Sequence, residues 1–205
     1  MSFLSINYRL KGPVVLFGFG KVGQRKYHAL KNIAPHIIVI DSAPLPDGWP
    51  QIAAHKYVKM KIKSDNFQKI IPRDTALVIV ALSDTFLSKE IAEYCHQSRT
   101  LVNVVDKPDL CSVFFPAVLR HEDLSIAIST NGKCPFYAKH LKNEFLKDLK
   151  RYGEECKLMT ELRVVSSNPK RDLDRVIQDT LFFQLLEQQN YPGALQRGRK
   201  IIGAI

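Results

Sequence analysis

Three glycines near the N-terminus limit the possible folds of this chain more than any other part of its sequence. Gly18, Gly20 and Gly23 form a G-x-G-x-x-G sequence directly after the apolar run 14–17. In a strand–loop–helix unit, the first glycine permits a tight turn and the second lets a pyrophosphate approach the backbone, while the third lets helix and strand pack closely. The free N–H groups at the start of such a helix favour phosphate. The motif therefore predicts a Rossmann-like dinucleotide site.

The first hundred residues alternate short apolar runs with helical patterns, which is typical of a parallel sheet with crossover helices. After the glycines, apolar residues recur at helical spacing until Pro35 ends the predicted helix. A second helix is expected after Ser83 or Asp84, either of which can cap it. The predicted strands are 14–17, 37–40, 56–62, 76–82 and 101–105.

Beyond residue 106 the pattern changes. The apolar runs 113–119 and 124–129 are separated by so few residues that they predict an antiparallel hairpin rather than a crossover. Pro135 and Pro169 each begin a predicted helix. The residues expected to share an apolar face are Tyr137, Leu141, Phe145 and Leu149 in the first helix, and Leu173, Ile177, Thr180 and Leu181 in the second.

The preferred cofactor follows from an acidic residue at the end of the second strand. Asp41 lies close to the roughly 20 positions after the first glycine at which a carboxylate binds the adenosine ribose hydroxyls. A carboxylate there would repel the extra phosphate of NADP, so NAD is the predicted cofactor. The residues expected to contact it are Gly18, Phe19, Gly20, Lys21, Val22, Asp41, Ser42, Ala81, Ser83 and Val104. The alternative is that the glycines only form a turn, and a dinucleotide alone names no reaction.

A candidate catalytic residue follows the fifth strand. In open α/β sheets, ligands collect at the carboxyl ends of the strands, where Asp106 is expected to lie. A carboxylate in that position can accept or donate a proton during catalysis. The alternative interpretation is a turn-forming aspartate before Lys107 and Pro108.

Several segments in the correct order resemble the siroheme synthase N-terminal family. They are residues 18–26, 103–111, 115–117, 124–130 and 132–135, and the resemblance extends over about residues 8 to 150. The sequence departs from the family pattern at Phe19, Gly23 and Asn131. Phe19 is expected to narrow the nucleotide loop, while the other two changes are expected to be sterically mild.

The resemblance implies NAD-dependent oxidation of precorrin-2 to sirohydrochlorin, and in some members insertion of Fe²⁺ into the product. It also implies a homodimer, and it matches Asp106 to the family's essential aspartate. The substrate carries many carboxylates, which suits the net charge of +10. The residues expected to bind it are Arg25, Lys26, Asn103, Ser129, Thr130 and Lys133. The alternative for these residues is that they are solvated charges or satisfy nearby backbone groups.

Taken together, the pattern and the resemblance predict an α/β fold in three parts. Residues 1–112 would form an NAD-binding Rossmann domain, residues 113–150 a small α+β dimerisation segment, and residues 151–205 a helical C-terminal domain. Without a paired spacing of histidines or cysteines, no metal site is expected. The absence of a long apolar segment and the scattered cysteines predict a cytoplasmic protein that does not bind membranes.

Two other functions remain open at this point. One is a regulatory NAD-binding module without turnover, such as a gating domain of a potassium transporter. The other is a nucleic-acid binder, which only the positive charge suggests. Because the Lys and Arg residues are scattered and lack interleaved aromatic residues, no nucleic-acid partner is expected.

Overall fold

The structure is a computed structural model that describes residues 9–50 and 52–204. The chain divides into two compact units, Met1–Phe114 and Phe115–Ile205, and each is described by itself. The division lies close to the predicted boundary at residue 112. The predicted boundary at residue 150 lies within a helix, and the three-part division stays a prediction.

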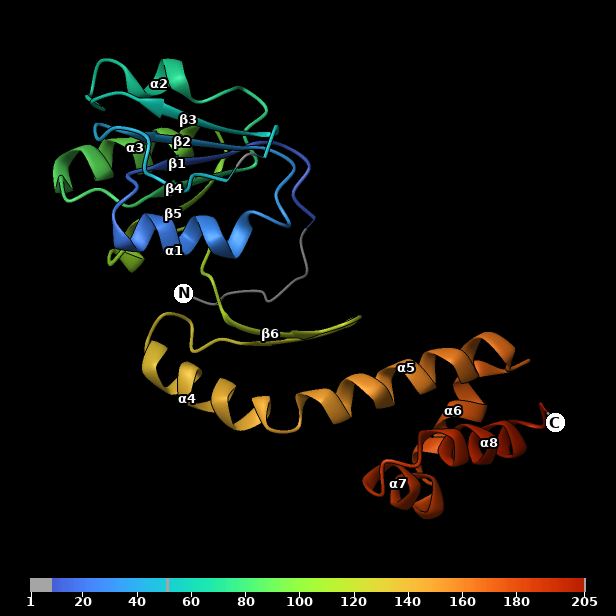
Figure 1. Cartoon of the computed structure of the whole chain (residues 1–205). Coiled ribbons are helices and arrows are strands. Elements are labelled where there is room, and N and C mark those ends of the chain that lie inside the picture. The colour runs from blue at the N-terminus through green and yellow to red at the C-terminus, as the bar shows by residue number, and fades with distance from the viewer. Residues whose placement is uncertain (1–8, 51, 205) are drawn as a thin grey trace. The chain divides into compact units, whose positions relative to one another are not determined.

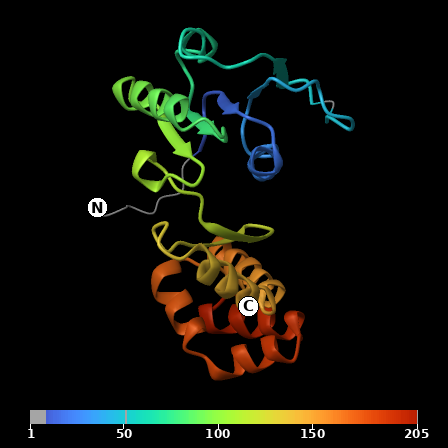
Figure 2. The same ribbon diagram turned by 90° about the vertical axis from the view of Figure 1, so that its left-hand side faces the viewer.

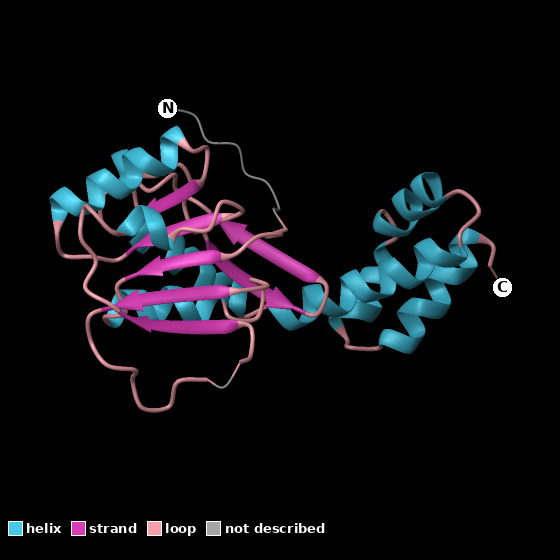
Figure 3. Ribbon diagram, turned by 90° about the horizontal axis from the view of Figure 1, so that it is seen from above, coloured by secondary structure: helices cyan, strands magenta, loops and turns pink. Residues whose placement is uncertain are grey.

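The first unit is built on a parallel sheet with the strand order β3-β2-β1-β4-β5. The strand order reverses between β1 and β4, and in open α/β sheets the ligand crevice lies at the carboxyl ends of the strands on either side of such a point. Figures 1 and 3 show the strands side by side. Their bounds are Val14–Phe17 (β1), Ile37–Asp41 (β2), His55–Lys59 (β3), Leu77–Val80 (β4) and Leu101–Val104 (β5).

Helices cover both faces of this sheet because both faces are apolar. Figure 2 shows α1, in blue, on the opposite side of the sheet from α3, in green. Strands β1 and β4 are buried along their whole length, as expected for central parallel strands. The helices are α1 (Lys21–Leu30), the short α2 (Phe67–Ile70) and α3 (Thr85–Gln97), followed by the 3₁₀ helix η1 (Pro108–Leu110).

The second unit begins with the predicted antiparallel hairpin, β6 (Ala117–His121) and β7 (Leu124–Ile128). Helices α4 (Pro135–Leu146) and α5 (Leu149–Val165) pack against the hairpin. The end of α5 joins three further helices around a separate apolar core. They are α6 (Pro169–Ile177), α7 (Thr180–Glu187) and α8 (Tyr191–Ile202).

The structure confirms the Rossmann-like sheet and the helical C-terminal region, but it corrects one predicted helix. The helix beginning at Pro169 ends at Ile177, and Asp179 caps a new helix by accepting a hydrogen bond from the Phe182 backbone N–H at 2.8 Å. The interruption rotates the apolar face, so Ile177 and Leu181 are exposed and Phe182 is buried. Thr180 is exposed as well, so the expected inward positions of Ile177, Thr180 and Leu181 were wrong.

Two strands are also shorter than the sequence predicts. β3 ends at Lys59, short of the predicted residue 62, and β6 begins only at Ala117 rather than at residue 113. Val113 instead joins β5 through its backbone, because its N–H donates to the Val102 carbonyl at 3.2 Å. Among the described residues, no helix has both the length and the apolar character that a membrane crossing requires.

Candidate active site

The glycine loop has the geometry that its sequence predicts. Gly18 has φ +89°, and a Cβ there would lie 2.4 Å from the Ala81 carbonyl oxygen, so only glycine fits between β1 and β4. A Cβ on Gly23 would lie 2.1 Å from the Gly18 carbonyl oxygen, which shows how closely α1 passes the loop. Gly20, the N-cap of α1, faces open space. The space beside Gly20 is where a pyrophosphate can reach the helix N-terminus.

Glycine in place of the family's alanine fits the close contact between the loop and α1 at residue 23. With a carbonyl oxygen so near, an alanine would force the loop and helix apart. The other departure, Asn131, has φ +53°, a left-handed conformation that asparagine tolerates better than most residues. Replacing a turn glycine by asparagine is mild, as expected.

Asp41 lies beside the loop at the end of β2. One carboxylate oxygen accepts a hydrogen bond from the Phe19 N–H at 2.5 Å, and the other accepts one from the Ala43 N–H at 2.8 Å. The carboxylate therefore holds the glycine loop and the loop after β2 together. Each oxygen keeps a lone pair that can accept a ribose hydroxyl.

Phe19 does not close the loop. Its ring packs against three other aromatic rings, whose centroids lie 5.5 to 5.8 Å from its own. We call these four residues, Phe19, Tyr27, Trp49 and Tyr57, the aromatic cluster. The Tyr27 hydroxyl is 2.8 Å from His55 Nδ1 in the core. The ring of Phe19 meets those of its neighbours edge to face. Burial raises the pKa of the Tyr57 hydroxyl and the charge of Asp41 raises it further, which indicates that the cluster lies near Asp41. Sequence analysis missed it because its members come from four separate segments.

The other predicted cofactor residues lie on both sides of the crevice. Ala81 follows β4 and donates its N–H to the Phe17 carbonyl at 2.7 Å. Val104 is 3% exposed, and its N–H and carbonyl both bond to the Cys111 sulfur, so its side chain belongs to the core below the site. The remaining predicted contacts, Lys21, Val22, Ser42 and Ser83, lie in the loops or first helical turn above the sheet and are exposed or half-buried.

Asp106 is exposed immediately beyond β5, with φ +59°. Burial lowers the pKa of the Lys26 ammonium on α1, and the charge of Arg25 lowers it further, while Cys111 and Asp106 act in the opposite direction. The carboxylate of Asp106 and the ammonium of Lys26 are therefore electrostatic neighbours. An acid after β5 and two basic side chains of α1 are thus close enough to influence one another electrostatically.

The residues along this edge follow the order of the strands. Asp41 ends β2, Gly18 follows β1, Ala81 follows β4 and Asp106 follows β5. Because neighbouring strands are about 4.8 Å apart, the two carboxylates flank an edge roughly 14 Å long. An extended dinucleotide fits such a span, with adenosine at Asp41 and the second half toward Asp106.

Three predicted substrate residues make hydrogen bonds to backbone groups. Asn103 is buried, and its Nδ2 donates to the Val113 carbonyl at 2.9 Å, while its Oδ1 has no partner among the described residues. In the second unit, Ser129 accepts from the Asn131 N–H and Thr130 accepts from the Cys134 N–H, both at 3.1 Å. These contacts favour the backbone-satisfying alternative for all three residues. Lys133 is exposed.

Cys111 is a residue that sequence analysis did not assign. Its sulfur accepts from the Val104 N–H at 3.2 Å and donates to the Val104 carbonyl at 3.2 Å. Burial raises the pKa of the Cys111 thiol, while the Val104 hydrogen bond and the Lys26 charge lower it. Cys111 thus joins η1 to β5 and fixes the turn that presents Asp106.

The fold and the crevice define a Rossmann-type dinucleotide-binding protein. Residues 6–117 match the family model described as "Putative NAD(P)-binding", and residues 122–147 match the model described as "Sirohaem biosynthesis protein central". The chain therefore belongs to this NAD(P)-binding family, and its resemblance to the siroheme synthase N-terminal family is confirmed. The predicted nicotinamide dinucleotide cofactor is confirmed with it.

Curated relatives are siroheme synthases. That of Ectopseudomonas mendocina is 27% identical over 98% of this chain and 44% of its own length. That of Blochmanniella pennsylvanica is 33% identical over 70% of this chain and 30% of its own length. The chain thus spans less than half the length of these relatives.

A solved structure named "SirC, precorrin-2 dehydrogenase" has a similar fold. The TM-score is 0.70 at 19% sequence identity, and the match covers 95% of this chain and all of that one. At this identity the likeness establishes the fold, and it extends through the helical C-terminal region.

Proposed function

We propose that the chain oxidises precorrin-2 to sirohydrochlorin with NAD as the hydride acceptor. The observation that carries this proposal is the single sheet edge that has the glycine loop, Asp41 and Asp106 in the order a bound dinucleotide requires. The siroheme synthase relatives and the precorrin-2 dehydrogenase of similar fold support it. The regulatory NAD-binding alternative is not favoured, since the curated relatives are siroheme synthases.

In the proposed reaction, two electrons leave a substrate carbon as hydride and a proton leaves with the oxidation. Bound NAD supplies the hydride acceptor, and the chain's own residues orient the substrate and handle the proton. Asp106 accepts the proton and, being exposed, passes it to solvent. Lys26 and Arg25, the basic side chains on α1, bind substrate carboxylates beside it.

Turnover with the wild-type chain tests the function. Incubation with precorrin-2 and NAD should produce NADH absorbance and sirohydrochlorin in equal amounts, because each product molecule releases one hydride. NADH formation without sirohydrochlorin, or no reaction with correctly folded protein, would refute the proposal. Addition of Fe²⁺ to sirohydrochlorin tests separately whether the chain also inserts the metal, the lyase activity that the resemblance implies.

The Asp41 carboxylate should make the protein select NAD over NADP. A 2′-phosphate would meet a carboxylate fixed by two backbone N–H groups, and like charges brought together cost several kcal/mol. We expect NAD to bind at least ~100-fold more tightly than NADP. Asp41→Asn should lower the ratio of NAD affinity to NADP affinity. Asp47→Asn, which alters an exposed aspartate and serves as the control, should leave the ratio unchanged. Equal binding of the two nucleotides by the wild-type protein would contradict the assignment.

We further propose that the chain is a homodimer held by its second unit. The β6–β7 hairpin pairs with no other strand among the described residues, so its edges are open. On α4, the predicted apolar stripe is exposed rather than buried at Tyr137 and Phe145, and neighbouring Phe136 is 84% exposed. An apolar surface of this kind is typical of a protein–protein interface.

Phe136→Asp should therefore weaken the dimer. Truncation of an aromatic anchor costs about 2 kcal/mol or more of binding energy, and a charge at the same position costs at least as much. Light scattering coupled to size exclusion should detect a dimer for the wild type and a monomer for the variant. Phe86→Asp, which alters an exposed phenylalanine on α3, is the matched control. If both variants stay dimeric, the proposed interface is wrong.

The proposals on cellular location and on nucleic-acid binding rest on the composition of the chain. The four cysteines are free, which fits a reducing cytoplasm. We propose no nucleic-acid partner, and the basic surplus is assigned to capture of the polycarboxylate substrate.

A further inference from the structure

We infer that His121, Glu122 and Glu154 form a binding site for a divalent first-row transition metal ion such as Zn²⁺. These three side chains all lie in the second unit, outside the proposed dehydrogenase site. One ligand atom from each of the three residues lies within 4.8 Å of the other two. His121 ends β6, Glu122 occupies the turn to β7, and Glu154 is on α5.

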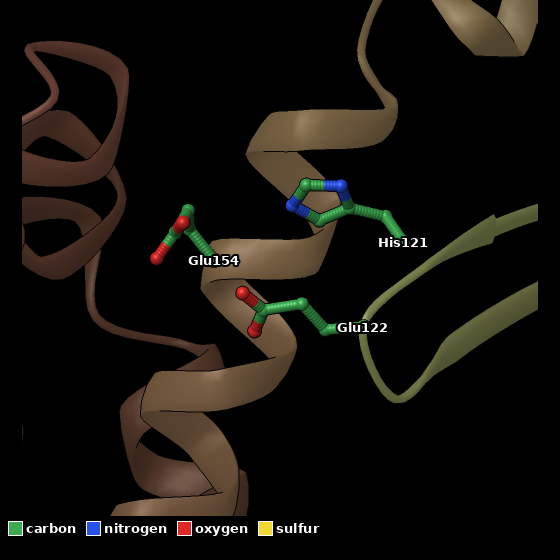
Figure 4. A group of neighbouring side chains, drawn as sticks. All are labelled: His121, Glu122 and Glu154. Carbon is green, nitrogen blue, oxygen red and sulfur yellow. The ribbon is translucent and has the colours of Figure 1, made fainter.

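The histidine supplies the strongest observation. Its Nε2 is buried and has no hydrogen-bond partner within the part of the chain that the structure describes. Figure 4 shows this ring nitrogen directed toward the carboxylates of Glu122 and Glu154. A buried polar atom without a partner is unfavourable, and coordination of a metal by the neutral imidazole would satisfy it.

A glycine in α5 makes room for the ring. A Cβ on Gly153 would lie 2.0 Å from His121 Cδ2, so any other residue would displace the imidazole. Glycine is unfavourable inside a helix, and its position directly beneath the ring permits the approach that brings Nε2 beside Glu154. The helix and the hairpin thus fit together around the histidine.

The two carboxylates have no cation of their own among the described residues. The nearest arginine along the helix, Arg151, pairs with Asp148 at 3.5 Å and with Glu155 at 3.9 Å, and not with Glu154. Two carboxylates this close repel each other, and a bound cation would offset that repulsion.

The donor set indicates the class of ion. Carboxylates alone suit Mg²⁺ or Ca²⁺, whereas an imidazole nitrogen added to carboxylate oxygens favours zinc and its first-row neighbours. Ligand atoms of a tetrahedral ion with bonds of ~2.1 Å are ~3.4 Å apart, so the side chains need to approach only slightly. Water would complete the coordination. The ion would join the hairpin turn to α5.

Titration of the full chain with Co²⁺, after removal of any affinity tag and treatment with a chelator, tests this inference. Cobalt bound by nitrogen and oxygen has a visible absorption that reports its ligands. We expect one Co²⁺ per chain, competition by Zn²⁺, and a higher Tm in the presence of either ion, since binding to the folded state alone stabilises it.

Two variants decide whether these residues are the ligands. His121→Ala and the double variant Glu122→Gln/Glu154→Gln should each weaken binding by more than the 10–100-fold typical of altering an outer-shell partner. The Gln variant keeps the side-chain shapes, so it decides the question if His121→Ala fails to fold. His140→Ala, at an exposed histidine on α4, is the matched control and should bind as the wild type does.

Absence of stoichiometric binding to the wild-type chain would overturn the inference. So would a folded Gln variant that binds Co²⁺ with wild-type affinity and the same spectrum.

Discussion

Asp106→Asn is expected to reduce kcat for precorrin-2 oxidation by about 10²- to 10⁴-fold, the usual contribution of a positioned acid or base. Asparagine is the appropriate replacement because residue 106 has φ +59°, which asparagine tolerates, whereas alanine would add ~1–2 kcal/mol of backbone strain. Single-turnover formation of NADH measures the effect.

Binding of NAD to the Asp106→Asn variant should be unchanged, because the residue follows β5 and the glycine loop follows β1. Asp109→Asn, which alters an exposed acid in η1, is the control and should keep wild-type turnover. A wild-type rate for Asp106→Asn would remove this residue from catalysis and leave the dinucleotide site intact.

Gly20→Ala is expected to weaken NAD binding by about 100-fold, or about 2.8 kcal/mol, while the Tm of the free protein stays near that of the wild type. Residue 20 has an extended backbone and open space where a Cβ would lie, so the apo-protein accommodates alanine. The added methyl group would occupy the position of the pyrophosphate. Calorimetric titration and a thermal melt measure the two quantities.

Gly23→Ala is the comparison for Gly20→Ala. Its Cβ would meet the Gly18 carbonyl oxygen, and overpacking of this kind costs ~1–3 kcal/mol, so the Tm should fall before any ligand is added. Unweakened NAD binding by a folded Gly20→Ala variant would show that the dinucleotide does not use this loop.

The sheet was predictable from sequence because its strands are short apolar runs. Residues that a dinucleotide fold requires lie at the ends of two of them. Gly18 and Asp41 stand where a dinucleotide fold requires a positive φ and a carboxylate, and the structure places them so. On α3, Leu87, Ile91 and Cys95 recur every four residues along the chain, and all three are buried. The pattern of apolar residues therefore predicts a helix or strand correctly where that element packs against others close to it in the sequence.

Local pattern failed where contacts join distant segments. The helix predicted beyond Pro169 breaks because Asp179 caps a new helix and pairs with Arg197 at 2.7 Å, a contact across 18 residues. His121 and Glu154 lie in different elements, so no short spacing indicates that they meet. The hydrogen bond from Asn103 to the Val113 carbonyl likewise joins β5 to the segment after η1, and the predicted substrate role of Asn103 stays a prediction.

A crystal structure of the chain with NAD and a non-reactive precorrin-2 analogue tests the central claim most directly. The account predicts the adenosine ribose at Asp41, the pyrophosphate beside Gly20, and the nicotinamide toward β5, with the Asp106 carboxylate in contact with the tetrapyrrole. A nucleotide bound in the opposite direction, or a tetrapyrrole bound away from Asp106, would contradict it.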